Sequence, residues 1–452
     1  MPVPMAERRW VLLAAALLPP AAITLLVAAY AVNVPYWDTW SWLERHYGAE
    51  DSTPAALLAR YWPLHNGHRV LVPLLFDRAL LWASSNDMLP RIFLKLPFSL
   101  GSLALVLHLA RRTAPGAPRA VLAGVLALLS FPLTYWPMWM DPRQFSIHIV
   151  VFCVLAAMVV ATGNMGARFR FVACAALCAV ASLSYAPGLL AWPVLGLVLW
   201  RRGPLRSAGA LASWCLVTLA VVVPHVRDLV VGTAADAGLR DGLRTVLAAC
   251  AVAGMPVAPA RGPVGAVPAV VTGALGIAAL LVLTAMAWRR APDVRDRALP
   301  WVALGGWAAA YAVLAGWARG TQSLDALLDP RFAYLAAQLW VALAALVSVL
   351  AFDGDLRPQQ AARWRRAYWE LGVVLVASYA TASLWPLHAP GGIGRLSTQL
   401  QTGRACLLEY ESADDACLEL LYPSAARVRD LTRTLQVKGA GFLIAEPPAT
   451  PR

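Results

Sequence analysis

Uncharged apolar stretches alternate with short polar connections along most of the chain. Many of these stretches reach the length of roughly 20 residues that an α-helix needs to cross a bilayer. Because a helix satisfies its own backbone hydrogen bonds in lipid, the pattern predicts an all-α fold, a polytopic transmembrane helical bundle. We expect about eleven spans, with two short helices sharing 171–200 across a Pro/Gly break; the ranges are 10–32, 90–109, 120–136, 145–161, 171–200, 207–224, 264–288, 299–317, 332–351 and 368–387.

The first connection, residues 33–89, is long and mixes polar with aromatic positions. We expect short helices lying on the membrane at Thr39–Tyr47 and Pro54–Tyr61. Residues 70–82 are apolar but carry an acid and an arginine, so this segment is predicted to be interfacial or only partly embedded.

Two further segments lie outside the expected spans. Residues 243–255 are apolar but short, which favours a surface or re-entrant helix. The polar tail after residue 387 contains a plausible small helical element. We therefore divide the chain into a transmembrane domain, 1–387, and a small external segment, 388–452, and find no internal repeat.

Composition agrees with a membrane protein. The chain is 60% hydrophobic and 14% charged, whereas soluble domains contain about 25% charged residues. The N-terminus resembles a signal peptide, with two arginines before an apolar run. No small-residue cleavage site occurs before the polar loop, so we expect this run to be kept as the first span.

The distribution of charge predicts the orientation. With the N-terminus inside, the inside segments (1–9, 111–119, 163–170, 201–206, 289–298 and 352–367) hold 18 arginines and 5 acids in 58 residues. The outside segments hold 18 cations and 19 acids in 183 residues. This follows the positive-inside rule and places the C-terminus outside. The net charge of +13 equals the inside excess, so it is a topology signal and does not favour nucleic-acid binding.

Two of the seven cysteines, Cys406 and Cys417, lie in the polar tail. If the tail faces an oxidising compartment, a disulfide across the intervening ten residues is expected. Two free thiols are the alternative. The other five cysteines lie in or beside apolar helices, and no CxxC metal pattern occurs.

Candidate chemistry is concentrated in the first external loop. Asp38 follows the first span within a cluster of tyrosine and tryptophan residues, and the loop closes with His65, Asn66, His68 and Arg69. Aromatic residues beside a span also form interfacial belts, and the belt is the alternative explanation.

Three more external turns carry an arginine near an acid: the first has Arg143, the second Arg227, and the third both Arg319 and Arg331. Each pair taken singly is explained by an ion bridge that closes the outer end of the bundle. Their recurrence on one side of the membrane favours a common site.

A carboxylate, several arginines and an apolar surround suit sugar transfer from a polyprenyl-phosphate donor. A base removes the proton of the acceptor hydroxyl, and the anomeric carbon passes through an oxocarbenium-like state. Arginine stabilises the charge that develops on the leaving phosphate. The chain has no GxxxxGK[ST] nucleotide-binding loop,.

The acid just after the first span and the long first outside loop resemble the GT-C glycosyltransferases, multi-span enzymes that use polyprenyl-phosphate sugars. Local strings also resemble a group of bacterial membrane proteins with an H-N-E-H-R box: His65–Arg69, Ala186–Pro193, Asp329–Phe332, and the tail cysteines with Leu421–Pro423. Here Gly67 stands where that box has glutamate, and Asp38 lacks the adjacent second acid of many GT-C loops.

The resemblance implies a role for each candidate. Asp38 would be the general base. Arg69 and Arg331 would clamp the phosphate, with Arg319 or Arg143 in reserve. The loop residues His65, Asn66 and His68 would contact sugar or phosphate. A metal held by both histidines and Asp38 is an alternative, and no other cofactor is expected.

The resemblance also implies the setting: the bacterial inner membrane, with a lipid-linked sugar as donor and an envelope glycan, lipid or protein as acceptor. Two other functions stay open. A lipid-linked sugar flippase or transporter predicts ionisable residues near the bilayer midplane and related halves. A non-catalytic envelope assembly protein would use the tail as its docking part.

Overall fold

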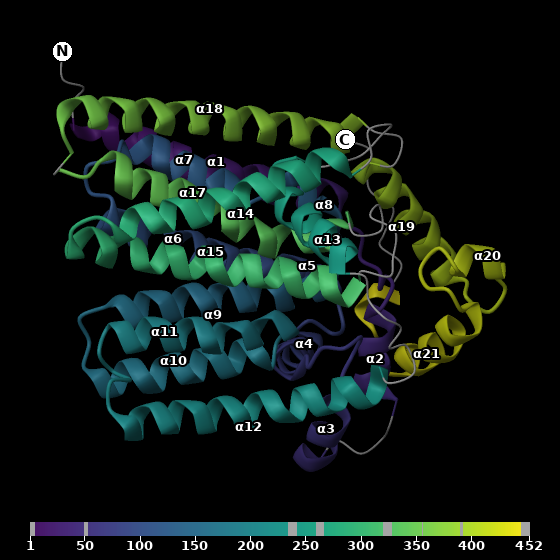
Figure 1. Ribbon diagram of the computed structural model, residues 1–452. Helices are drawn as coiled ribbons and strands as arrows, with labels where there is room; N and C mark the ends of the chain where they lie inside the picture. Colours follow the sequence, from purple (N-terminus) through teal and green to yellow (C-terminus); the bar gives the residue numbers. More distant parts are fainter. Residues whose placement is uncertain are drawn as a thin grey trace.

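The computed structural model describes residues 5–48, 53–233, 242–258, 266–319, 328–354, 356–388 and 392–443. Within these ranges the chain is helical and forms no strand, only an isolated bridge between His65 and His68. The longer helices run side by side (Figure 1). They are α1 (Met5–Tyr30), α6 (Lys95–Thr113), α7 (Arg119–Ser130), α9 (Phe145–Thr162), α10 (Ala167–Ser182), α11 (Ala191–Arg201), α12 (Ala208–Thr233), α14 (Val267–Trp288), α15 (Pro292–Arg319), α17 (Ala333–Ala351) and α18 (Pro358–His388).

The all-α membrane fold predicted from the sequence is confirmed. Seven helical segments are long and apolar enough to cross a bilayer; they coincide with all or most of α1, α6, α9, α12, α14, α15 and α17. The other expected spans correspond to the shorter helices α7, α10 and α11 and to α18. The number eleven therefore stays a prediction.

Helix α17 forms the centre of the bundle. All of its 19 residues are buried, as expected for a helix that is hydrophobic on every side. The short helix α13 (Gly242–Gly254) crosses α14 closely, because glycines stand where they touch. A Cβ at Gly254 would lie 2.0 Å from the Ala269 carbonyl oxygen, and one at Gly273 would lie 1.8 Å from that of Cys250.

The first loop, residues 33–89, contains α2 (Thr39–Tyr47), α3 (Pro54–Tyr61) and α4 (Leu71–Ala83), followed by the single turn α5 (Leu89–Phe93). The bounds of α2 and α3 confirm the helices expected there. The Pro/Gly break is also confirmed: the 3-10 turn η3 (Ala186–Leu190) separates α10 from α11.

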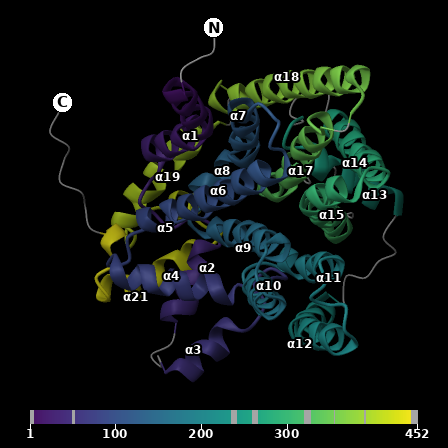
Figure 2. The same ribbon diagram turned by 90° about the vertical axis from the view of Figure 1, so that its left-hand side faces the viewer.

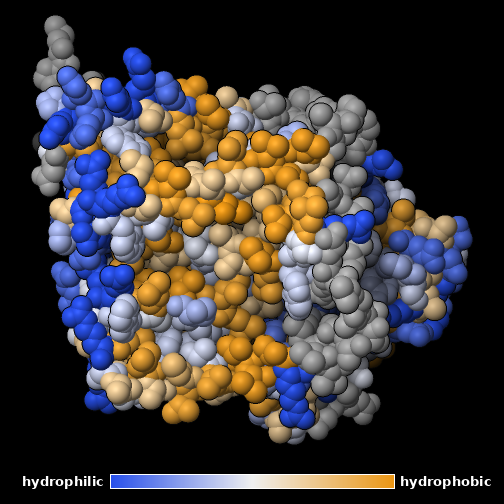
Figure 3. All heavy atoms as spheres, in the orientation of Figure 1, coloured by the Kyte–Doolittle hydropathy of each residue, from blue (hydrophilic) through white to orange (hydrophobic). Residues whose placement is uncertain are grey.

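The two ends of the bundle differ in character. The arginine-rich connections between α6 and α7, α9 and α10, α14 and α15, and α17 and α18 share one end (Figure 1). Hydrophilic side chains gather at that end, and a hydrophobic band covers the adjoining face (Figure 3). The tail and the first loop lie at the opposite end (Figure 1).

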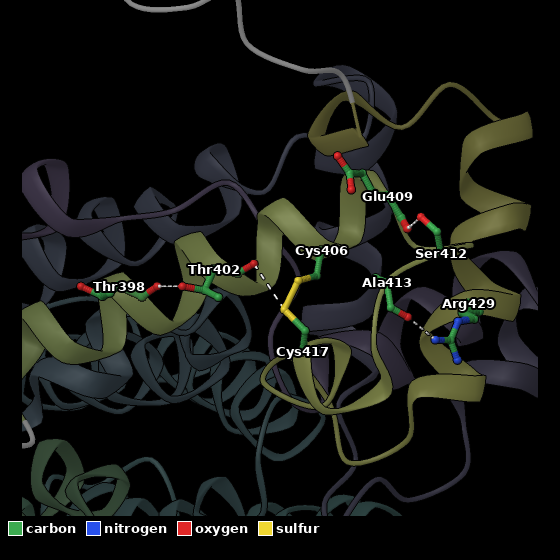
Figure 4. Close-up of a disulfide and its surroundings, with 8 residues drawn as sticks. All are labelled: Thr398, Thr402, Cys406, Glu409, Ser412, Ala413, Cys417 and Arg429. Carbon is green, nitrogen blue, oxygen red and sulfur yellow. Dashed lines mark hydrogen bonds between the residues drawn. A yellow bond between two sulfur atoms is a disulfide. The ribbon is translucent and has the colours of Figure 1, made fainter.

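The tail forms α19 (Ile393–Leu408), α20 (Asp415–Leu418), α21 (Ala425–Val437) and the turn η5 (Gly441–Leu443). A disulfide joins Cys406 to Cys417 and so ties α19 to α20 (Figure 4). The tail shares one hydrophobic core with the first loop, in which Leu407 and Val428 cluster with Trp40. Figure 2 shows α21 beside α4 and α2.

Candidate active site

A cavity of about 750 Å³ opens where the first loop, two later turns and the tail meet. Two of its walls are the turns that begin α9 and α17. Because both helices end at the arginine-rich connections, the cavity lies at the other end of the bundle, near the tail. Six residues predicted from the sequence line it: Asp38, His65, Asn66, His68, Arg143 and Arg331.

Asp38 stands immediately before α2 but does not cap it. Aspartate at this position commonly accepts a hydrogen bond from the first turn. Here its Oδ2 instead accepts from Asn66 Nδ2 and Arg143 Nη1, both at 2.9 Å, and lies 3.8 Å from His65 Nε2. The side chain is 29% exposed, so the carboxylate faces the cavity without pointing into open water.

The backbone that aims Asp38 is strained. Trp37 has a φ of 49°, a region that bulky residues adopt at a cost of roughly 1–3 kcal/mol. A hydrogen bond of 2.8 Å from Trp37 N–H to the Leu421 carbonyl stabilises this conformation. Because Trp37 directly precedes Asp38, the tail helps to set the direction of the carboxylate.

A tight turn presents the two histidines. His65 and His68 exchange backbone hydrogen bonds of 2.8 and 3.0 Å, and the residues between them, Asn66 and Gly67, have φ values of 50° and 78°. Two positive φ values in succession are typical of a type I′ turn, for which Asn-Gly is the preferred pair. Gly67 therefore suits this backbone. The His68 ring lies on Tyr185, with ring centroids 3.9 Å apart.

Two turns of the cavity share a sequence, Asp-Pro-Arg, and a geometry. In each turn the aspartate Oδ1 accepts from the arginine backbone N–H, at 3.0 Å for Asp141–Arg143 and 2.9 Å for Asp329–Arg331. The guanidinium then donates back to Oδ2 of the same aspartate. Each turn is a short 3-10 helix, η2 (Pro142–Gln144) or η4 (Pro330–Phe332). Local turn chemistry thus presents two arginines to one cavity in the same way.

Arg143 joins two carboxylates from distant parts of the chain. Its Nη1 donates to Asp38 and its Nη2 donates to Asp141 at 2.7 Å. The neighbouring His65 ring and the Arg143 charge lower the pKa of Asp38 from 3.8 to about 2. Asp38 is therefore ionised at neutral pH and, while paired, is a weak proton acceptor.

Lys95 stabilises the backbone of the Asp141 turn by hydrogen bonds. Its side chain is fully buried in α6, and Nζ donates to the carbonyl oxygens of Asp141 at 2.7 Å and Met138 at 3.2 Å. A side-chain nitrogen that donates to two carbonyls fixes the backbone from which Arg143 projects. No sequence pattern predicted a role for Lys95 at the site.

Arg69, expected in the phosphate clamp, does not line the cavity. Its guanidinium is 2% exposed, pairs with Asp228 at 2.5 Å and donates to the carbonyls of Trp62 and Pro224. Arg143, expected only in reserve, contacts Asp38 directly. Arg319 ends α15, and its side chain lies outside what the structure describes.

The tail contributes Arg395 and Gln399 of α19 to the cavity wall. The sequence had no signal for this, because nothing local relates α19 to the first loop. The repeated Asp-Pro-Arg string, at Asp141–Arg143 and Asp329–Arg331, is a signal in the sequence for both turns. Within the described residues, the structure gathers no group of three or more His, Cys, Asp or Glu side chains able to hold a metal ion.

A scan of protein-family models and a search of curated sequences found no match. Among solved structures the chain is similar to ArnT from Cupriavidus metallidurans bound to undecaprenyl phosphate, with 16% identity and a TM-score of 0.42 over 94% of this chain and 77% of that one. It is similar to apo ArnT with 18% identity and a TM-score of 0.44, covering 97% and 78%. It is also similar to the archaeal oligosaccharyltransferase AglB from Archaeoglobus fulgidus, in complex with an inhibitory peptide and a dolichol-phosphate. The identity is 12% and the TM-score 0.47, over 92% of this chain and 59% of AglB. ArnT and AglB are GT-C glycosyltransferases. The likeness assigns no role to any residue of this chain.

Proposed function

We propose that this chain is a membrane glycosyltransferase that moves a sugar from a polyprenyl-phosphate donor to a hydroxyl of an envelope acceptor at the external face. One observation carries the proposal: a cavity in which one ionised carboxylate, Asp38, meets two arginines on matching Asp-Pro-Arg turns. The cavity opens at the end of the bundle opposite the arginine-rich connections, where the positive-inside rule places the external surface.

The transfer step balances with these groups. The acceptor oxygen forms a bond to the anomeric carbon, and its proton passes to the Asp38 carboxylate. The bond between the anomeric carbon and the phosphate oxygen breaks, and the electron pair leaves with the polyprenyl phosphate. Arg143 and Arg331 stabilise the added negative charge on that phosphate.

Donor binding also prepares the base. In the resting cavity Arg143 is shared between Asp38 and Asp141. A donor phosphate competes for this guanidinium and draws it away from Asp38. Because Arg143 is one of the groups that lower the pKa of Asp38, its withdrawal makes the carboxylate a better proton acceptor when an acceptor hydroxyl arrives.

The test is transfer by the purified full-length protein. The protein is reconstituted in vesicles with polyprenyl-phosphate sugars whose sugar is radiolabelled, and envelope extracts supply the acceptor. Labelled product and released polyprenyl phosphate are both measured. Release of one polyprenyl phosphate for each sugar transferred, with a glycosidic bond between sugar and acceptor in the product, supports the proposal. Sugar that crosses the vesicle membrane still attached to its lipid supports a flippase instead.

Orientation is tested separately with a membrane-impermeant maleimide on cells. In a background without exposed native thiols, a cysteine at Glu411 in the tail is expected to react from outside. A cysteine at Arg112, in an arginine-rich connection, is expected to stay unlabelled. The reverse pattern would contradict an external cavity.

A further inference from the structure

A second, smaller cavity of about 290 Å³ lies between α4 and the end of α21. Its lining contains two cations and no acidic residue: Tyr47, Arg78, Leu81, Trp82, Ser85, Asn86, Lys438 and Gly439. This differs from the larger cavity, where aspartates accompany the arginines. The excess of positive charge indicates an anionic ligand.

The two cations flank one aromatic ring. The guanidinium carbon of Arg78 lies 5.3 Å from the centroid of the Tyr47 ring, and Lys438 Nζ lies 5.8 Å from the same centroid. Both side chains also line the same cavity, so the two charges border one space. The floor of the cavity is held by hydrogen bonds, since Tyr47 donates to the Asn86 side chain and Gly441 N–H donates to the Ser85 carbonyl.

Helix α4 lies across the bundle. It is seen nearly end-on in Figure 1, where the long helices run across the view. On one face Asp77 is fully buried and pairs with Arg91 at 2.5 Å. Away from Asp77, the helix exposes Leu75, Phe76 and Trp82, which are 52%, 43% and 86% exposed. A helix perpendicular to the spans with an apolar outer face is typical of the membrane interface, where tryptophan is enriched.

Trp82 therefore connects the apolar face of α4 to the cationic cavity, because it belongs to both. We propose that this cavity binds the phosphate headgroup of an anionic bilayer lipid, whose acyl chains cover the exposed face of α4. Arg78 and Lys438 pair with the phosphate, and the Trp82 indole lies at the level of the headgroup. The site is independent of the proposed transferase reaction.

The test uses the full-length protein in detergent, titrated with phosphatidylglycerol or phosphatidylcholine of the same acyl chains and analysed by native mass spectrometry. Wild-type protein is expected to bind phosphatidylglycerol more tightly. Lys438→Gln is expected to weaken that binding about fivefold, the worth of one basic residue at a lipid surface. Arg433→Gln removes the same charge from α21 outside the cavity and is the matched control.

Equal binding of phosphatidylglycerol by Lys438→Gln and Arg433→Gln would overturn the proposal, and so would equal affinity of wild type for the two lipids. Two further arms identify the source of the phosphate. Displacement of phosphatidylglycerol by millimolar inorganic phosphate, or preferential displacement by polyprenyl phosphate, would overturn assignment to a bilayer lipid. Arg78→Gln is the second variant, and its thermal unfolding is compared with wild type because Arg78 also donates to the His46 carbonyl. With unfolding unchanged, its binding of phosphatidylglycerol is expected to weaken, and wild-type binding would overturn the proposal.

Discussion

Replacing Asp38 with asparagine removes the proton acceptor while keeping the shape of the cavity. General-base catalysis contributes roughly 10²–10⁴-fold to rate, so we expect kcat to fall by about that factor. Donor binding is expected to improve rather than weaken. Arg143, which Asp38 engages at 2.9 Å, then has one carboxylate partner left and is more available to a phosphate.

The size of this gain can be bounded from the pKa of Asp38. A shift from 3.8 to about 2 corresponds to about 2 kcal/mol of net stabilisation of the ionised carboxylate by its surroundings, after burial has opposed part of the attraction to its neighbours. Arg143 supplies only part of it, since His65 is the larger cause. The donor KM of Asp38→Asn should therefore fall by no more than about tenfold.

The assay is steady-state transfer with the donor varied, together with direct binding of polyprenyl phosphate. Glu44→Gln is the matched control, because Glu44 lies on α2, which Asp38 directly precedes, pairs with Arg427 and does not line the cavity. Its kcat and KM should equal those of wild type. A kcat of Asp38→Asn equal to that of wild type, whatever its KM, would refute the role of Asp38 as base.

The same substitution has a signature in stability against pH. The lowered pKa of Asp38 means that its ion pair stabilises the folded state above pH 4, and this contribution is lost as the pH falls from about 4 to 2,. The difference in free energy of unfolding between wild type and Asp38→Asn should therefore be present at pH 6 and be mostly lost at pH 2,. A constant difference over this range would contradict the ion pair.

Other substitutions separate binding from stability. Arg331→Gln should raise the donor KM about 10- to 100-fold and leave the thermal unfolding temperature unchanged. Arg69→Gln should lower the unfolding temperature and leave the donor KM of the folded fraction unchanged. A raised donor KM in Arg69→Gln and an unchanged one in Arg331→Gln would instead place Arg69 at the phosphate. Asp77→Asn leaves a fully buried arginine without its charged partner and should cost about 3–5 kcal/mol, measured by denaturant unfolding in detergent; a loss below about 1 kcal/mol would contradict the buried pair. Replacing Cys406 and Cys417 together by serine should destabilise the tail by about 3 kcal/mol and speed its cleavage in limited proteolysis, and an unchanged cleavage rate would show that the disulfide contributes little.

Local signals explain which parts of the fold were predictable. Helix α3 begins where Thr53 accepts a hydrogen bond from Ala56 N–H and Pro54 occupies the first turn, a common start signal. The break between α10 and α11 follows from Pro187 and Gly188. A Cβ at Gly188 would lie 2.2 Å from the Ala181 carbonyl carbon, so only glycine fits there. Such features depend on neighbours in the sequence and can be recognised without a structure.

Contacts between distant segments explain what was missed. Arg69 is adjacent to His68 in sequence, yet its partner Asp228 is 159 residues away, and no local pattern relates the two. The tail was expected to be a small appended element, but its Leu421 carbonyl holds the Trp37 backbone. A backbone acceptor leaves no mark in the sequence, because every residue carries one.

The matching Asp-Pro-Arg turns lie between these cases. The hydrogen bond from the arginine N–H to the aspartate side chain is ordinary turn chemistry for that residue type, so the turn geometry was predictable at both Asp141 and Asp329. Their convergence on Asp38 was not, because it depends on how α9 and α17 pack. The sequence thus indicated the two turns that line the cavity while ranking Arg69 above Arg143.

The position of a bound donor phosphate tests the central claim most directly. A cryo-electron microscopy map of the protein in nanodiscs with polyprenyl phosphate should show the phosphate within hydrogen-bond distance of both Arg143 and Arg331, with Asp38 facing the same space. A phosphate bound elsewhere, with both arginines still paired only to their aspartates, would contradict it.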